Sequence, residues 1–149
     1  MQPLRVYLAC TIRGDRAQVP VARAIEEALT AAGHEVLTGR FLDERAENED
    51  GALSEQDVFA RDLAWLERAD VLVAEASGST YGVGFEAGYV LARAAGTGQR
   101  LIVIYQAEKR SRISRLISGL TSPYARCGGY TTPAEAVAFV QDALAELCR

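Results

Sequence analysis

The sequence contains few of the residues that build metal sites and disulfides. Its 149 residues include one histidine, His34, and three widely spaced cysteines, Cys10, Cys127 and Cys148, with no Cys-x-x-Cys pair. One histidine argues against a structural zinc site and leaves no convincing Ser-His-Asp triad. An odd number of dispersed cysteines argues against a disulfide framework and is typical of a reducing compartment. We therefore expect a cytoplasmic protein without a bound metal.

Long apolar runs and blocks of like charge are also missing. The apolar run near the N-terminus is too short for a signal peptide or a membrane span. The net charge is −4 and no basic stripe occurs, so neither a membrane nor nucleic acid is expected as a partner. Hydrophobic residues make up 49% of the chain and charged residues 24%, which is ordinary for a globular protein. We predict a single domain over residues 1–149.

Short apolar segments alternate with helical patterns along the chain. The expected strands are Arg5–Cys10, His34–Thr38, Val71–Ala76, Leu101–Tyr105 and an irregular, possible edge strand within Tyr124–Thr132. The expected helices are Pro20–Ala32, Ser54–Arg68, Tyr81–Ala95 and Pro133–Leu147, with a short basic helix or turn at Ser111–Ser118 and an acidic loop at Leu42–Ala52. This order predicts a doubly wound α/β domain, Rossmann-like or flavodoxin-like, with a five-stranded parallel sheet and helices on both faces.

Polar, glycine-containing segments follow three of the expected strands. They are Thr11–Asp15, Ser77–Gly84 and Gln106–Ser114, and they supply hydroxyl groups, backbone N–H groups and cations. Ligands of doubly wound folds bind beyond the carboxyl ends of the strands, so these segments predict a pocket suited to a sugar and a phosphate. The glycines from Gly82 to Gly88 do not fit a dinucleotide fingerprint, because the last interval is one residue too long.

Glu86 is a carboxylate among small and apolar residues. In the helix expected over Tyr81–Ala95, only Glu86 and Arg93 are charged. Burying an unpaired charge is costly, so Glu86 either has a partner in the fold or faces a cleft where it does chemistry. Near a helix start, the dipole and the free N–H groups favour the ionised form, which suits a nucleophile.

Other polar residues leave two interpretations open. Asp62 is either a plain polar position on an amphipathic helix or, if it faces the pocket, a second carboxylate for acid–base work. Arg13 is either a surface arginine or an anion ligand at the tip of the first strand. The cations between Lys109 and Arg115 either form a solvated face or attract a phosphate. Tyr7, by its alternation in the first strand, fits the core better than a site.

Three segments, in this order, resemble those of a known family. They are Tyr7-Leu-Ala-Cys-Thr-Ile-Arg-Gly14, the stretch from Asp62 to Glu75, and Thr80-Tyr-Gly-Val-Gly-Phe-Glu-Ala-Gly88. Together they resemble the 2'-deoxynucleoside 5'-monophosphate N-glycosidases of the nucleoside 2-deoxyribosyltransferase superfamily, over nearly the whole chain. This resemblance implies a nucleotide substrate and no metal or organic cofactor.

The resemblance also implies a role for each residue. Glu86 would attack the anomeric carbon, Asp62 would assist base departure and the water step, and Tyr7 would position Glu86 beside the sugar. The substrate phosphate and sugar would be bound by Cys10, Thr11, Ile12, Arg13, Thr80, Gly82 and Ser114. The serine would be donated by the neighbouring subunit of a homodimer.

Three positions depart from the family pattern. Cys10 stands where a glycine is expected, Thr80 replaces a serine, and Arg40 stands near the place of a histidine that follows the second strand. The threonine keeps the hydroxyl group. The other two changes leave the exact substrate open, Cys10 through the phosphate loop and Arg40 through base recognition.

The sequence thus favours a hydrolase that releases the free base and 2-deoxyribose 5-phosphate through a covalent intermediate on Glu86. One alternative is a nucleoside 2-deoxyribosyltransferase, which would pass the sugar to a second base. The other is a nucleotide-binding sensor without turnover. The cationic and hydroxyl-bearing loops favour a phosphorylated substrate, and so the hydrolase over the transferase.

Overall fold

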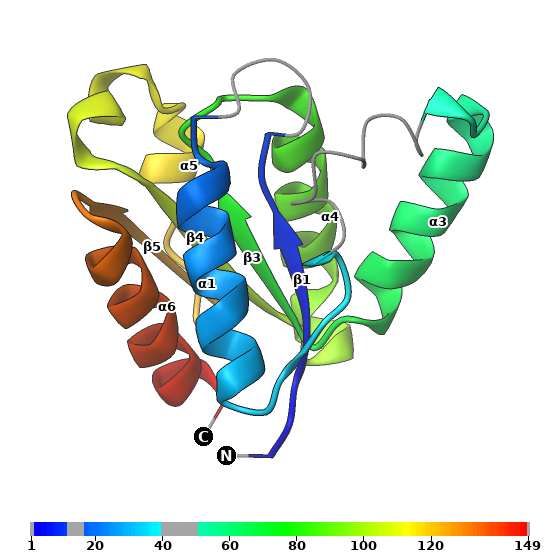
Figure 1. The fold of residues 1–149 in the computed structure, drawn as a ribbon, viewed down its shortest axis with the longest axis horizontal. Coiled ribbons are helices and arrows are strands. Elements are labelled where there is room, and N and C mark those ends of the chain that lie inside the picture. The colour runs from blue at the N-terminus through cyan, green and yellow to red at the C-terminus, as the bar shows by residue number, and fades with distance from the viewer. Residues whose placement is uncertain (1, 12–16, 40–50, 149) are drawn as a thin grey trace.

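Five short apolar segments form one parallel sheet. A computed structural model gives the structure of residues 2–11, 17–39 and 51–148. The strands are β1 (Arg5–Ala9), β2 (Glu35–Val36), β3 (Val71–Glu75), β4 (Arg100–Gln106) and β5 (Ala125–Tyr130). They lie in the order β2-β1-β3-β4-β5, and every neighbouring pair is parallel. The predicted α/β fold with a five-stranded parallel sheet is confirmed (Figure 1).

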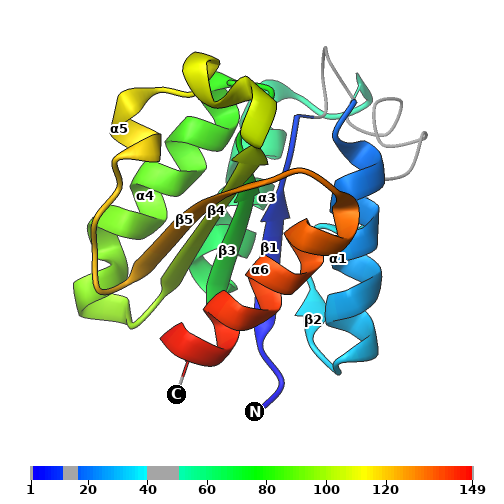
Figure 2. The same ribbon diagram turned by 90° about the vertical axis from the view of Figure 1, so that its left-hand side faces the viewer.

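Helices cover both faces of the sheet. The first face carries α1 (Val19–Ala31) and α6 (Pro133–Leu147), and the second carries α3 (Glu55–Arg68) and α4 (Tyr81–Thr97). A 3-10 segment, η2 (Ala107–Arg112), and the short helix α5 (Arg115–Ser118) follow β4. Figure 2 shows α1 and α6 together on one side of the strands, with α4 on the other. None of the helices in the described ranges is both long enough and apolar enough to cross a bilayer.

Alternate residues of the central strands face the two helical layers. In β3, Val71 and Val73 pack in the core beneath α1 and α6, whereas Leu72 and Ala74 pack beneath α3 and α4. All five residues of β3 are buried. This two-sided burial explains why the central strands are continuous apolar runs in the sequence.

The second strand is shorter than predicted because the Thr38 side chain, not the backbone, forms the next hydrogen bonds to β1. The Thr38 hydroxyl accepts a hydrogen bond from Leu8 N at 2.9 Å and donates one to Leu8 O at 2.7 Å. Thr38 thus satisfies both backbone groups that a longer β2 would have paired. The pairing of β2 is therefore confined to Glu35 and Val36.

The chain beyond β4 is more regular than predicted at one place and less regular at another. β5 is an ordinary six-residue edge strand paired with β4, not an irregular segment. The expected basic helix over Ser111–Ser118 is instead divided between η2 and α5, because Ser114 caps α5 by accepting a hydrogen bond from Leu116 N. Most of the acidic loop expected at Leu42–Ala52 lies outside the described residues.

Helix starts follow the sequence signals. The Ser54 side chain accepts a hydrogen bond from Asp57 N at 3.1 Å at the start of α3, as predicted. At the start of α6, Thr132 and Glu135 form a capping box in front of Pro133. These caps fix where α3 and α6 begin, and α3 carries one of the two carboxylates considered next.

Candidate active site

Glu86 is held by a tyrosine of the first strand. Tyr7 lies in β1 with its side chain towards the layer of α3 and α4, and it is 2% exposed. Its hydroxyl group donates a hydrogen bond of 2.7 Å to Glu86 Oε1. Burial, followed by the negative charges of Glu86 and Asp62, raises the pKa of Tyr7, so the phenol stays protonated and remains a donor. Tyr7 is therefore both a core residue, as its position in the strand suggested, and a partner of Glu86.

The expected effect of the helix dipole on Glu86 is outweighed by burial. Glu86 is the sixth residue of α4, beyond the first turn where free N–H groups point. Burial is the largest influence and raises the pKa of Glu86, the hydrogen bond from Tyr7 lowers it, and the charge of Asp62 raises it; together they bring the pKa to about 7. Glu86 therefore lacks the free N–H groups of a helix start, and burial works against its ionisation.

Asp62 shares a cavity with Glu86. This cavity, which we call the carboxylate cavity, has a volume of about 170 Å³ and lies between α3 and α4. Besides the two acids it is lined by Phe59, Leu63, Leu66, Gly82 and Phe85. Of the two interpretations of Asp62, the structure therefore favours the one in which it faces the cavity. Within the described ranges Glu86 forms no salt bridge, which leaves its carboxyl group available at the cavity wall.

Arg61 fixes Asp62 and was missed in the sequence. Its Nε donates to Asp62 Oδ1 at 2.8 Å, and its Nη2 lies 2.8 Å from the same oxygen. The Arg61 guanidinium also lies over the Trp65 ring, 5.1 Å from the ring centre. Neighbouring residues on a helix normally point in different directions, so no periodicity rule signals this contact. Both contacts use one carboxylate oxygen, Oδ1.

Two predicted ligands at the end of β1 are buried. Cys10 is 8% exposed and Thr11 is 4% exposed. No hydrogen-bond partner of the Thr11 hydroxyl is found in the part of the chain that the structure describes. A Cβ atom at Gly78 would collide with this hydroxyl, so the glycine allows the turn after β3 to approach the end of β1. Two further predicted ligands, Ile12 and Arg13, lie outside the described residues. So does Arg40, which stands near the place of a histidine in the family pattern.

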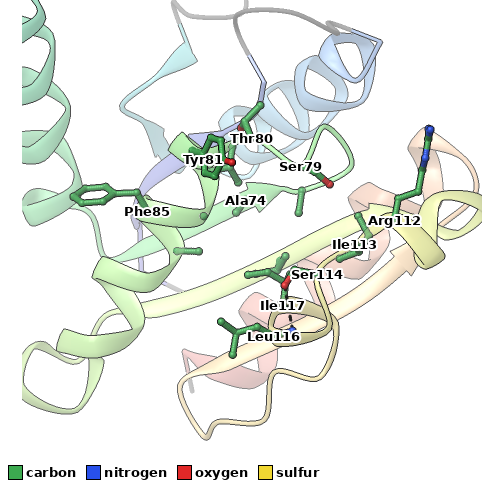
Figure 3. A pocket seen from close by; sticks show the side chains of 15 residues that line it. Ala74, Ser79, Thr80, Tyr81, Phe85, Arg112, Ile113, Ser114, Leu116 and Ile117 are labelled. Atoms are coloured by element: carbon green, nitrogen blue, oxygen red, sulfur yellow. Dashed lines mark hydrogen bonds between the residues drawn. The ribbon is translucent and has the colours of Figure 1, made fainter.

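Thr80 and Ser114 line a second, larger cavity. It has a volume of about 720 Å³ and walls that are mainly apolar, and we call it the hydroxyl cavity. Figure 3 shows Thr80 at the start of α4 and Ser114 at the start of α5, on different walls. The Thr80 side chain makes no cap hydrogen bond, although Thr80 is the N-cap of α4. Of the predicted cations, Arg112 lines this cavity.

The predicted site residues thus fall into two groups. The first group lies at the carboxylate cavity, which is lined by Asp62, Gly82 and Glu86. Tyr7 belongs to this group through its hydrogen bond to Glu86. Thr80 and Ser114 meet at the hydroxyl cavity, and Phe85 lines both cavities. Across the described ranges, no group of three or more His, Cys, Asp or Glu side chains is arranged to hold a metal ion. Two carboxyl groups in one cavity can together supply a nucleophile and an acid–base group.

The chain is similar in sequence to known proteins. The family model described as nucleoside 2-deoxyribosyltransferase matches residues 6–131. A Thermofilum pendens protein named 2'-deoxynucleoside 5'-phosphate N-hydrolase 1 is 37% identical over 134 residues, which cover 90% of each chain. The mouse 5-hydroxymethyl-dUMP N-hydrolase is 34% identical over 119 residues, covering 78% of this chain and 66% of the mouse protein.

The fold is also found among solved structures. The CMP N-glycosidase of Clostridium botulinum superposes with a TM-score of 0.62 at 19% identity, over 92% of this chain and 97% of that one. At this identity the likeness concerns the fold alone.

Proposed function

We propose that this chain, which belongs to the nucleoside 2-deoxyribosyltransferase family, hydrolyses the N-glycosidic bond of 2'-deoxynucleoside 5'-monophosphates. The products would be the free base and 2-deoxyribose 5-phosphate. The observation that carries the proposal is the pair of carboxyl groups in one cavity, with Glu86 oriented by the Tyr7 hydroxyl. Relatives named as N-hydrolases of such nucleotides support the choice of substrate.

The first chemical step would use Glu86 as the nucleophile. The reacting form has Glu86 ionised and Asp62 protonated. The Glu86 carboxylate attacks C1' of the sugar, the bond from C1' to the base nitrogen breaks, and the departing base takes the Asp62 proton, directly or through water. The bond electrons leave with the base, and the transition state has oxocarbenium character. Because the Tyr7 hydroxyl holds Oε1, the attacking oxygen is oriented before the substrate arrives.

The second step would release the sugar phosphate. Asp62, now ionised, takes a proton from a water molecule, the water oxygen bonds to C1', and the ester bond to Glu86 breaks. Arg61 contacts Asp62 Oδ1 and so orients the carboxyl group for these proton transfers. The proposed steps use side chains and water alone.

Phosphate binding would supply the energy that places C1' against Glu86. The candidates are Thr11, whose buried hydroxyl has no partner among the described residues, and Thr80 at the N-terminus of α4. Cys10, Ile12, Arg13, Gly82 and Ser114 complete the proposed binding set. A phosphorylated substrate is thereby distinguished from an unphosphorylated nucleoside.

Chromatography of reaction mixtures tests this function. Purified protein is incubated separately with each deoxynucleoside monophosphate, ribonucleoside monophosphate and unphosphorylated deoxynucleoside, and free base is quantified. We expect base release from the deoxynucleotides, and none above background from the matched Glu86→Gln variant. Full base release by Glu86→Gln would overturn the proposal.

Base transfer is the second candidate, because the matching family model describes a transferase. Both activities share the glycosyl-enzyme and differ in the acceptor, water or a second base. Adding a second free base to the same incubation separates them. A new nucleotide or nucleoside in the products would identify transfer, and free base with sugar phosphate alone identifies hydrolysis.

We also propose that the site is completed in a homodimer, with Ser114 donated by the neighbouring subunit. Tyr81 is fully exposed and Leu116 is 84% exposed, and both line the hydroxyl cavity. Large apolar side chains exposed at a cavity rim favour burial against a partner. Ser114 is two residues from Leu116 and would enter the partner's site with it.

Mixing two inactive variants tests the contribution in trans. In a mixed dimer of Glu86→Gln and Ser114→Ala subunits, one site would contain both an intact Glu86 and an intact Ser114 from the other chain. We expect activity to be regained on mixing. If Ser114 acts within its own chain, mixing restores nothing, and sedimentation analysis establishes whether the variants form dimers.

A further inference from the structure

A second glutamate and tyrosine pair lies at the carboxyl ends of the strands. Glu75 is the last residue of β3 and is completely buried, and Tyr130 is the last residue of β5 and is 2% exposed. The Tyr130 hydroxyl lies 3.0 Å from Glu75 Oε1. Neither residue lines the carboxylate cavity or the hydroxyl cavity. A carboxyl group with no access to solvent needs a structural or chemical reason.

Glu75 connects the turn after β3 to the end of β4. Ser77 N donates to both carboxyl oxygens of Glu75, at 3.3 Å and 3.2 Å, and the Ser77 hydroxyl also contacts Oε1. The same hydroxyl oxygen accepts a hydrogen bond of 2.7 Å from Gln106 N, at the last residue of β4. Glu75 therefore holds Ser77, and through it the position of the turn relative to the sheet.

This turn leads directly into the proposed site. Gly78 has no room for a Cβ atom beside Thr11, and Ser79 adopts a φ of +49°, a region that few residues other than glycine occupy. The next residue is Thr80, the N-cap of α4, which is the helix that carries Glu86. A strained turn persists only when surrounding contacts hold it, and the Glu75 contacts are placed to do so.

The hydrogen bonds around Glu75 can be satisfied if it carries a proton. The Tyr130 hydroxyl lies 2.9 Å from Gln18 Oε1 and 3.0 Å from Glu75 Oε1, yet it has one hydrogen to donate. As the Gln18 amide is oriented here, its buried Nε2 has no hydrogen-bond partner among the described residues. In this orientation, a charged Glu75 would give two acceptors for the one Tyr130 hydrogen. If Glu75 is neutral, its O–H donates to the Tyr130 oxygen and the Tyr130 O–H donates to Gln18. The contact between Glu75 and Tyr130 and the contact between Tyr130 and Gln18 then each contain one hydrogen.

The surroundings of Glu75 act on its ionisation in both directions. Burial raises its pKa, and this is the largest influence. The hydrogen bonds from Ser77 and Tyr130, and the positive charge of Lys109 on η2, act to lower the pKa. Burial also raises the pKa of Tyr130, so its hydroxyl keeps its hydrogen. For this orientation of the Gln18 amide, burial and the count of hydrogens both favour a neutral Glu75.

We propose that Glu75 is a positioning residue that fixes the turn between β3 and α4, and that it does so as a neutral carboxylic acid. This inference rests on the proposed function to the extent that Thr80 and Glu86 bind and attack the substrate. Glu75 itself would touch neither substrate nor water. Its effect would pass through Ser77 to the N-terminus of α4.

Two substitutions at this position separate charge from shape. Glu75→Gln keeps the shape and supplies the N–H donor that a neutral acid would supply, whereas Glu75→Leu removes every polar contact. We expect Glu75→Gln to retain kcat/KM for a deoxynucleoside monophosphate within about threefold, and Glu75→Leu to lose about tenfold or more, mainly through KM. The loss should be smaller for an unphosphorylated deoxynucleoside, because the displaced turn carries the proposed phosphate ligand.

The alternative arrangement makes the opposite prediction. If the Gln18 amide were turned so that its nitrogen donated to Tyr130, a charged Glu75 could accept the Tyr130 hydrogen. Glu75→Gln would then lose as much activity as Glu75→Leu, which would overturn the neutral form. Unchanged kinetics in Glu75→Leu would overturn the positioning role.

An infrared spectrum tests the protonation state without any activity. To remove the contribution of the partly protonated Glu86, the comparison is made in Glu86→Gln protein. The carbonyl stretch of a protonated carboxylic acid should be present near neutral pH in Glu86→Gln and absent from the double variant Glu75→Gln, Glu86→Gln. Its absence from both would refute the neutral acid. Because this readout does not need turnover, a protein that released no base would refute the proposed function and leave the Glu75 result interpretable.

Discussion

Two glutamates of this protein are each paired with a buried tyrosine of the sheet, and the two pairs have different surroundings. Tyr7 donates to Glu86, whose carboxyl group lines a cavity beside a second acid. Tyr130 lies against Glu75, which is sealed from solvent. The first pair presents a carboxyl group to a cavity that it shares with Asp62. The second uses its carboxyl group to join strand ends.

The comparison shows that access to a cavity, not the pair itself, decides what a buried acid can do. Burial raises the pKa of both glutamates. At Glu86 the value is about 7, so that a large fraction of the carboxyl groups is ionised near neutral pH and available for attack. At Glu75 a neutral acid satisfies the hydrogen bonds, and no reacting atom can reach it.

Replacing Glu86 should give the largest difference in activity between the two glutamate and tyrosine pairs. The Glu86→Gln variant removes the proposed nucleophile with almost no change in volume. We expect base release from deoxynucleotides to fall by at least about a thousandfold, with the fold unchanged. Single-turnover assays with far-ultraviolet circular dichroism measure both. A residual activity within tenfold of the original would show that Glu86 is not the reacting glutamate.

Glu86 should also make stability depend on pH. Its pKa is about 7 in the fold and near 4.5 in the unfolded chain, so between these values the folded state holds the proton more tightly. Stability therefore falls as pH rises through this window and is lowest above about 7. A shift of this size corresponds to at most about 3 kcal/mol.

The variant Glu86→Gln cannot ionise and provides the matched control. Relative to the unsubstituted protein, it should gain stability between about pH 5 and about pH 8. Urea unfolding of both proteins at the two pH values measures the difference in their free energies of unfolding. A constant difference between the two proteins would mean that Glu86 is not desolvated in solution.

Removing the tyrosine from the Glu86 pair should change the pH profile. The Tyr7 hydrogen bond lowers the pKa of Glu86, so Tyr7→Phe should raise it above the present value of about 7. The acid limb of kcat/KM would then move to higher pH, and activity near neutral pH would fall by about tenfold. Part of the loss should be recovered in alkaline buffer, because Glu86 ionises there. A profile that keeps its shape and falls uniformly would contradict this role of Tyr7.

Much of the fold and part of the site could be predicted from local patterns. The alternation of apolar strands and amphipathic helices indicated the parallel sheet, and the few charges in α4 indicated Glu86. Asp62 lies in a helix with several other charges, so its role came from the family resemblance, and helix periodicity could not decide whether it faced a cavity. These features depend on residues close together in the chain.

The features that were missed depend on contacts between distant segments or on competing energies. Strand alternation places Tyr7 on a face but does not show that its hydroxyl reaches α4, a contact that the family resemblance alone had indicated. Thr38 ends β2 by bonding to Leu8, 30 residues away in sequence. For Glu86, the sequence suggested a favourable helix start, and the balance with desolvation required the packed structure.

Removing the tyrosine from the Glu75 pair should have the smallest effect. Tyr130→Phe leaves Gln18 Oε1 and Glu75 without their shared hydroxyl in a buried place, which should lower the free energy of unfolding by about 1 to 3 kcal/mol. Because Tyr130 does not contact Glu86, the acid limb of kcat/KM should stay where it is, in contrast to Tyr7→Phe. Urea unfolding and a pH profile of the same variant measure the two quantities. A displaced acid limb in Tyr130→Phe would show that the two pairs are coupled, and the separation between a reacting glutamate and a positioning one would then have to be given up.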